Sequence, residues 1–336
     1  MLSALIARSR LEALLAASRG KHVVVIGDAM LDVYLRGDAD RISPEAPVPV
    51  VRVKDRRHAL GGAANVAQNV VALGANATLV AAVGSDMAAG TIRNMLEAIG
   101  ATPAGLVTVN RPTTTKTRVV ARAQQLLRVD EEVDHDLSGT EIETLQQAVA
   151  TALATADALV LEDYNKGVLV PALITAAVAA ARARKIPVIV DPKYRNFFAY
   201  TGATVFKPNR RELEAALGAA VDVDHPASLP AVVERVGAEA LLLTLSERGM
   251  ALIERGAAGG APVHRIPTTA REVYDVVGAG DTVTAYLAAM LAAGASRLEA
   301  AVVANFAAGV EVGKSGAATV SPAEVLEAYD HHHGRV

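Results

Sequence analysis

The segment HVVVIGD, residues 22–28, determines how the rest of the chain is interpreted. Its apolar run ends in Gly-Asp, which is typical of a strand that is buried on both faces of a parallel sheet. Comparable runs occupy residues 77–84, 157–163, 186–191, 203–209 and 239–249. Ala-rich helical patterns separate them, so the sequence predicts an α/β fold with a doubly wound, mostly parallel sheet and helices on both faces.

Several of these apolar runs end in polar residues, namely Asp28, Asp163, Asp191, Asn209 and Ser246. In open parallel sheets, ligands bind at the carboxyl ends of the strands. We therefore expect these strand ends to assemble a functional site.

The composition suits one folded domain over residues 1–336, because 51% of the residues are hydrophobic and 21% are charged. The net charge of −3 gives no reason to expect nucleic acid or an anionic membrane as partner. The chain has no cysteine, which excludes disulfides and thiolate metal sites and fits a cytoplasmic location. No apolar run approaches the ~20 residues that span a bilayer. The spacing of Leu11, Leu14 and Leu15 predicts an amphipathic helix near the N-terminus.

Two segments, residues 34–60 and about 106–128, alternate apolar and polar residues and have no helix between their strands. They predict antiparallel strands that are set apart from the main sheet. The first segment contains RISPEAPVPVV, in which Pro47 and Pro49 are two residues apart. Their missing N–H donors would lie along one edge, so we expect an edge strand of a small sheet.

The strongest catalytic signal is the segment YDVVGAGD, in which Gly278, Ala279 and Gly280 precede a long apolar helix that starts near Asp281. Backbone N–H groups at a helix N-terminus, approached through small residues, can bind an anion. Asp281 would take a proton from an attacking hydroxyl there, which is the combination that phosphoryl transfer needs. The alternative is a simple turn with an Asp cap.

Paired glycines also occur in LGGAANVAQNV, residues 60–70, where Gly61 and Gly62 let the backbone approach a ligand. Asn65 and Asn69 follow at a spacing that places them on one helical face. The alternative is a tight loop with surface amides.

Two further segments carry charged residues at strand ends. In KPNRRE, Lys207 suits phosphate charge and Glu212 can hold Mg²⁺ through water; an ordinary strand-to-helix turn is the alternative. In GDAMLDVY, Asp32 can accept hydrogen bonds from sugar hydroxyls, or lie in a loop without function. A Walker A loop is absent, as is a G-x-G-x-x-G motif after the first strand, which argues against a P-loop ATPase and an NAD enzyme.

Taken in order, these motifs resemble those of the ribokinase-like (PfkB) carbohydrate kinases. The matching features are Gly61-Gly62 with Asn65, an Asn-x-x-Glu at Asn209–Glu212, and an Asp-x-x-Gly-Ala-Gly-Asp at Asp275–Asp281. The resemblance covers roughly residues 20–325. It implies a ribokinase-like fold in which segments 34–60 and 106–128 form a β-strand lid over the sugar, often building a homodimer.

The resemblance also implies roles for individual residues. Asp281 would be the general base, beside the backbone of Gly278, Ala279 and Gly280. Glu212 would hold Mg²⁺ through water, and Asp275 a monovalent cation such as K⁺. Many relatives carry Thr where this chain has Val277. The positions that would serve ATP are Lys207, Asn209, Glu212, Thr244, Ser246, Gly249 and Asn305.

Within that family the chain resembles the kinases that phosphorylate O1 of D-glycero-β-D-manno-heptose 7-phosphate during synthesis of lipopolysaccharide core precursors. The segments GDAMLDVY, RISPEAPVPVV, GGAANVAQNV, TKTRVVARAQQLLRVD and SGAATVSP carry this resemblance. Most members of that group that we know are fused to an adenylyltransferase. This chain has no H-x-G-H motif, so we expect the free-standing kinase form.

The resemblance assigns sugar contacts to Asp32, Gly61, Gly62, Asn65 and Asn69. A phosphate on C7 needs cations, and the evenly spaced residues of one strand face supply candidates: Lys116, Arg118, Arg122 and Arg128. The alternative is a solvated strand face. Two other functions stay open, namely a ribokinase-like kinase for fructose 6-phosphate or a nucleoside, and a sugar-sensing binding protein without catalysis.

Overall fold

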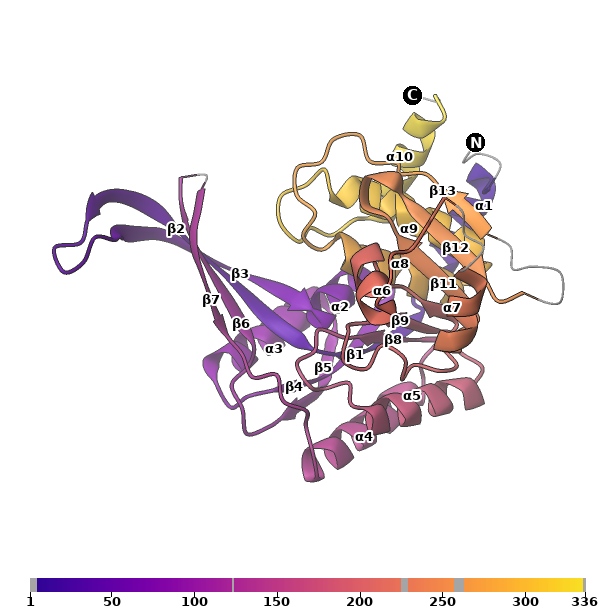
Figure 1. Cartoon of the computed structure of the whole chain (residues 1–336), viewed down its shortest axis with the longest axis horizontal. Coiled ribbons are helices and arrows are strands. Elements are labelled where there is room, and N and C mark those ends of the chain that lie inside the picture. The colour runs from indigo at the N-terminus through magenta and orange to yellow at the C-terminus, as the bar shows by residue number, and fades with distance from the viewer. Residues whose placement is uncertain (1–4, 123, 225–228, 257–262, 335–336) are drawn as a thin grey trace.

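A computed structural model describes residues 5–122, 124–224, 229–256 and 263–334 of the chain. In this part of the chain the strands form two sheets (Figure 1). One has nine strands in the order β13-β12-β11-β10-β9-β8-β1-β4-β5, and the other has four in the order β3-β2-β6-β7.

The large sheet is parallel from β5 to β11. At its other end, β12 pairs antiparallel with β11, and β13 pairs antiparallel with β12. This confirms the predicted doubly wound, mostly parallel sheet. Its strands are β1 (His22–Gly27), β4 (Asn76–Val83), β5 (Thr102–Thr108), β8 (Ala158–Glu162), β9 (Val188–Asp191), β10 (Val205–Phe206), β11 (Ala240–Thr244), β12 (Met250–Glu254) and β13 (Val263–Ile266).

Helices cover both faces of the large sheet. One face packs against α1 (Arg8–Ala17), α2 (Ala63–Ala72), α3 (Met87–Ile99), α8 (Ala279–Ala292), α9 (Arg297–Glu311) and α10 (Pro322–His332). The other packs against α4 (Thr140–Leu153), α5 (Pro171–Ala183), α6 (Arg210–Leu217) and α7 (Leu229–Val236). The predicted N-terminal helix is α1. None of the helices described is long and apolar enough to cross a membrane.

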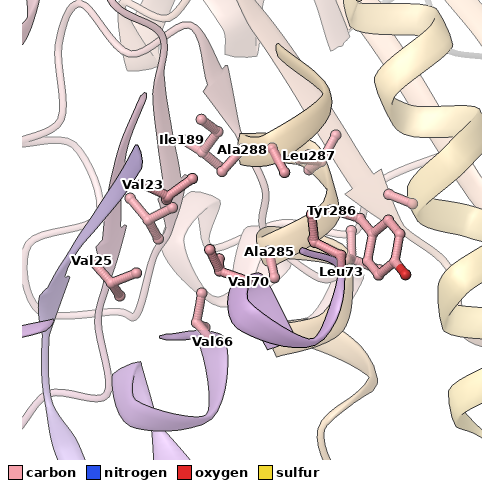
Figure 2. Packing of buried hydrophobic residues seen from close by; sticks show 14 of the residues in the cluster. Val23, Val25, Val66, Val70, Leu73, Ile189, Ala285, Tyr286, Leu287 and Ala288 are labelled. Carbon is pink, nitrogen blue, oxygen red and sulfur yellow. The ribbon is translucent and has the colours of Figure 1, made fainter. Parts of the chain in front are cut away.

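The central strand β1 explains why its sequence is apolar without alternation. Val23 and Val25 belong to the core on one face of the sheet, whereas Val24 and Ile26 belong to the core on the other. Figure 2 shows Val23 and Val25 close to side chains of α2 and α8. A strand with helices on both sides has no face left for polar residues.

The four-stranded sheet, here called the lid sheet, projects away from the body of the molecule (Figure 1). It consists of β2 (Ala29–Ile42), β3 (Pro49–Gly62), β6 (Thr115–Ala121) and β7 (Gln124–Glu131). The β2–β3 and β6–β7 pairs are antiparallel, but β2 and β6 are parallel. The prediction of purely antiparallel strands is therefore wrong for the central pair.

The bounds of the lid also differ from those predicted from the sequence. The first lid segment begins at Ala29 instead of residue 34. Residues 106–108 end β5, which is the outer strand of the large sheet, so the second lid segment begins only at Thr115. Period-two alternation does not distinguish the two locations, because β5 is an edge strand with one partly exposed face.

The prolines of RISPEAPVPVV lie at the tip of the β2–β3 hairpin. Ile42 pairs with Pro49, so Pro44 and Pro47 fall in the exposed connection 43–48. Placing Pro47 in a strand was wrong, because closely spaced prolines remove the donors that a ladder needs. The edge position was predicted correctly, since β3 is an outer strand of the lid sheet and Pro49 is its first residue.

Asp28, which follows β1, organises the loop after the neighbouring strand β8. Its buried carboxylate accepts hydrogen bonds from the backbone N–H groups of Tyr164 (2.8 Å), Lys166 (2.9 Å) and Val168 (3.2 Å). Burial raises the pKa of Asp28, and these three bonds oppose that shift. The loop that carries Tyr164 is therefore held by one carboxylate.

We expect Asp28→Ala to lower the free energy of unfolding by about 3 kcal/mol, because it leaves buried backbone donors without an acceptor. Urea unfolding monitored by circular dichroism measures this. The exposed Glu45 provides a control, since Glu45→Ala should change stability by less than about 0.5 kcal/mol. Equal stability of the two variants would show that Asp28 does not hold the loop.

Candidate active site

The N-terminus of α8 lies at the centre of the site. Gly278 is its N-cap residue with φ of 96°, a left-handed conformation that favours glycine, and no side chain caps the helix. Ala279 and Gly280 are the first two helical residues. The N–H of Ala279 donates to the oxygen of Val276 (3.4 Å), so the N–H groups of Gly280 and Asp281 are the ones available to bind an anion.

Asp281 is the third residue of α8 and is buried. Its carboxylate accepts a hydrogen bond from Nδ2 of Asn65 (2.6 Å) and another from the hydroxyl of Tyr164 (2.8 Å). Burial raises the pKa of Asp281 to about 6, and the two hydrogen bonds oppose that shift. A carboxylate with this pKa is mostly ionised at neutral pH and remains a competent proton acceptor.

The two asparagines of α2 take different positions. Asn65 contacts Asp281 directly, whereas Asn69 is fully buried and donates to the backbone oxygen of Asn65 (3.0 Å). The hydroxyl of Thr282 donates to Oδ1 of Asn69 (3.2 Å). Asn69 therefore lies behind Asn65 and fixes its orientation. This packing does not favour a direct contact between Asn69 and a sugar.

Lys207 brings a positive charge to the same place. It follows β10, is buried, and donates from Nζ to Oδ2 of Asp191 at the end of β9 (2.7 Å). A Cβ atom on Gly280 would lie 3.7 Å from Nζ of Lys207. The ammonium group is thus next to the first turn of α8, where it can neutralise phosphate charge.

Glu162, the last residue of β8, was not predicted as a site residue. Its oxygens are buried and have no hydrogen-bond partner, and they lie within 4.8 Å of carboxylate oxygens of Asp191 and Asp281. Burial, followed by the charges of Asp191 and Asp281, raises the pKa of Glu162 well above its usual value. Its only sequence signal was its position at the end of an apolar run, next to Asp163.

The Asn-x-x-Glu motif begins α6. Oδ1 of Asn209 accepts from the N–H of Glu212 (2.9 Å), and Oε2 of Glu212 accepts from the N–H of Asn209 (2.8 Å). The alternative interpretation, an ordinary strand-to-helix turn, therefore also describes these residues, and their side chains cap the helix. The other oxygen of Glu212 accepts from Lys193, whose ammonium group lies 5.1 Å from the ring centroid of Tyr164.

The other residues expected to contact ATP belong to elements that follow α6 in the chain. Thr244 ends β11 and forms a β-bridge with Asn209. Ser246 opens a short 3₁₀ helix that Gly249 ends, with φ of 81°. A Cβ atom on Gly249 would collide with the backbone of residues 266–268, and Asn305 of α9 donates to the oxygen of Pro267 (2.9 Å).

Asp275 connects two loops at the start of α8. Oδ1 accepts from the N–H of Val277 and Oδ2 accepts from the N–H of Gly316, both at 3.0 Å. The carboxylate therefore ties the segment before the glycines to the loop between α9 and α10.

The lid sheet brings Asp32 and Gly61 to the site. Oδ1 of buried Asp32 accepts from Nη1 of Arg118 (2.6 Å), and a Cβ atom on Gly61 would lie 3.0 Å from Oδ2 of Asp32. Gly62 has φ of 57° and joins the lid to α2; a Cβ atom on it would collide with the backbone oxygen of Asp28. Close packing thus requires both glycines.

Three of the four cations predicted for the phosphate share one face of the lid sheet, because Lys116 lies opposite Asp32 and Arg118 lies opposite Arg128 in the strand register. Lys116 pairs with Asp130 and Glu132, and Arg128 pairs with Asp130. Arg122 follows β6 with φ of 56°, and its side chain is 83% exposed. Of the four, only Arg118 forms an ion pair with Asp32. Acids pair with Lys116 and Arg128 instead, and Arg122 lies beyond the end of β6.

Residues 20–324 match the sequence model of the pfkB family of carbohydrate kinases. The chain belongs to this family. Its members are kinases that use ATP, so the uncapped α8 N-terminus, Lys207 and Asp281 lie in an environment suited to phosphoryl transfer.

A curated relative is the bifunctional protein HldE of Pelobacter propionicus, which is 48% identical over 327 residues, or 96% of this chain and 66% of that protein. The chain spans about two thirds of the length of the curated relatives it matches, 62–66% for the first two.

Two solved structures share the fold. Phosphofructokinase-2 from Escherichia coli in complex with potassium has a TM-score of 0.74 and 20% identity, covering 93% of this chain and 99% of that one. Ribokinase from Arabidopsis thaliana, complexed with ribose and ATP, has a TM-score of 0.70 and 22% identity, covering 92% and 98%. The predicted ribokinase-like fold is thus confirmed.

We expect Tyr164→Phe to shift the acidic limb of the pH–rate profile to higher pH. The substitution removes a hydrogen bond that lowers the pKa of Asp281, so this pKa should rise above about 6. A base must be ionised, so activity should fall as pH drops through the raised value. Rates of ADP release between pH 5 and 9 measure the limb. The exposed Tyr194 gives a control, and an unmoved limb in Tyr164→Phe would contradict the assignment.

Proposed function

We propose that this kinase transfers the γ-phosphoryl group of ATP to O1 of D-glycero-β-D-manno-heptose 7-phosphate, giving the 1,7-bisphosphate in ADP-heptose and lipopolysaccharide core precursor synthesis. The observation that carries the proposal is buried Asp281 in the first turn of helix α8, whose N-terminus no side chain caps. The heptose-kinase segments quoted above and the 48% identity to HldE support the acceptor.

In this mechanism Asp281 accepts the proton of the O1 hydroxyl while O1 forms a bond to the γ-phosphorus. The bond between that phosphorus and the β,γ-bridging oxygen breaks, and ADP leaves. The N–H groups of the first turn of α8 and the ammonium of Lys207 stabilise the charge of the transferring group. Asn65 and Tyr164 hold the carboxylate of Asp281 in place.

Magnesium and potassium belong to the same proposal. Glu212 is the candidate for Mg²⁺ through water, because its carboxylate at the start of α6 offers hard oxygen atoms; the N–H of Asn209 and the ammonium of Lys193 hold this carboxylate in place. Bound Mg²⁺ would neutralise phosphate charge. Asp275 is the candidate for K⁺, supported by its carboxylate beside α8 and by a fold relative described with potassium. The positions for ATP remain those from Lys207 to Asn305 named above.

A homodimer through the lid is also part of the proposal. The lid sheet exposes several large apolar side chains, and such a patch is costly to leave in water. They are Ile42, Val48, Val53, Leu126, Leu127 and Val129.

We expect Asp281→Asn to lower turnover by about 10³-fold, because an amide cannot accept the O1 proton. Binding of ATP should change little, since the nucleotide contacts lie elsewhere. ADP release and titration calorimetry measure the two quantities. Glu143→Gln, at an exposed position of α4, is the control. Turnover above a tenth of wild type would remove Asp281 from the role of base.

The acceptor is tested by ADP release with heptose 7-phosphate, fructose 6-phosphate, ribose and adenosine in parallel. We expect turnover on the heptose at a kcat/KM that exceeds the others by about 10² or more. Preference for another acceptor would retain the kinase and refute the heptose assignment. Binding of sugar and ATP without turnover on any of them would favour a sugar-sensing protein.

A further inference from the structure

Three arginines surround Tyr34 on the lid sheet. In the strand register, Tyr34 of β2 lies opposite Arg57 of β3 and opposite Arg118 of β6. Residues directly opposite on neighbouring strands share a face of the sheet. The guanidinium carbons of Arg118 and Arg36 lie 5.3 Å and 6.0 Å from the ring centroid of Tyr34. The side chains of three strands therefore meet at one place.

This face of the lid is the one that looks toward the active site. Asp32 precedes Tyr34 by two residues and so lies on the same face. Asp32 is buried and accepts a hydrogen bond from Arg118. The carboxylate of Asp275, before α8, is close enough to influence the hydroxyl of Tyr34, whose pKa is raised mainly by burial.

The cluster carries uncompensated positive charge. Arg118 is paired with Asp32, but within the described residues Arg36 and Arg57 form no ion pair. Asp55 lies opposite Arg36 in the register without forming one. In contrast, Lys116 and Arg128 on the same sheet are neutralised by acids.

We propose that Arg57, Arg118 and Tyr34, with Arg36 beside them, bind the terminal phosphate monoester of the acceptor sugar. Arginine forms paired hydrogen bonds to phosphate oxygens, and the phenol offers one more donor. Two residues of a strand span about 7 Å. A sugar whose hydroxyls meet Asp32 thus extends a distal phosphate toward Tyr34. Arg128 lies opposite Arg118 on the same face but pairs with Asp130, and Arg122 lies beyond the end of β6, so neither belongs to this phosphate-binding group. The acceptor's identity rests on the proposed function.

The test compares Arg57→Ala with Arg56→Ala. Arg56 is the adjacent exposed arginine, lies opposite Leu35, and so points to the other face of the lid. With heptose 7-phosphate, Arg57→Ala should raise KM about tenfold or more and leave kcat nearly unchanged, as expected for loss of a charged hydrogen bond in binding. Arg56→Ala should change KM by less than about twofold.

The second acceptor is the same heptose without phosphate. Wild type should prefer the phosphorylated sugar, and Arg57→Ala should lose most of that preference while using the unphosphorylated sugar as wild type does. Arg57→Lys should recover part of the effect, because lysine offers charge without the paired donors. Equal losses on both sugars, or an effect of Arg56→Ala as large as that of Arg57→Ala, would overturn the site.

Titration calorimetry separates this proposal from the proposed function. Heptose 7-phosphate and fructose 6-phosphate are titrated into wild type and Arg57→Ala. If Arg57→Ala binds either sugar phosphate more weakly than wild type does, the result supports the phosphate site around Tyr34. This holds even if wild type shows no turnover of the heptose, in which case only the heptose assignment fails. Unchanged binding in Arg57→Ala overturns the anion site and leaves the kinase assignment intact. Absence of sugar-phosphate binding to wild type refutes both.

Discussion

The burial of strand β1 between two helical layers is the constraint on which the rest of the structure depends. Because both faces of the strand are apolar from Val23 to Ile26, the polar residues His22 and Asp28 stand only at its two ends, and Asp28 is the one at the carboxyl end. The neighbouring strands obey the same constraint, so Glu162, Asp191 and Lys207 gather along one edge of the sheet. The charged groups of the site therefore lie at the carboxyl ends of these strands, just outside the apolar core.

Buried charge at that edge must be balanced. Three carboxyl groups of Glu162, Asp191 and Asp281 share a small volume with the ammonium of Lys207. Isolated ions would be costly there, so burial raises the pKa of Glu162 and Asp281, while Lys207 pairs with Asp191. The same burial raises the pKa of both groups, and for Asp281 it brings the pKa to about 6.

The lid sheet differs from the large sheet because helices do not cover both of its faces. It can therefore carry polar side chains along its strands and bring them to the site. Its base is fixed by the close approach of Gly61 and Gly62 to Asp32 and Asp28. Farther out, its inner face carries Tyr34 and the arginines around it. At the base of the lid sheet, the charge of Asp32 is balanced by that of Arg118. The additional positive charge of Arg36 and Arg57 lies farther along the strands.

The sequence by itself determined the alternation of strands and helices, the glycine-led start of α8 and the position of Asp281, because these depend on local periodicity and on backbone requirements near each residue. It also identified Asp32, Asn65 and Asn209 as polar residues at element ends. Only the tertiary structure decided that Asn69 lies behind Asn65, that Glu162 and Tyr164 adjoin Asp281, and that β5 leaves the lid. It also placed Arg122 beyond the end of β6, apart from Arg118. These contacts depend on strand order and on pairing between distant segments of the chain. The spacing of residues along one strand does not show which charged residues a neighbouring strand places beside them.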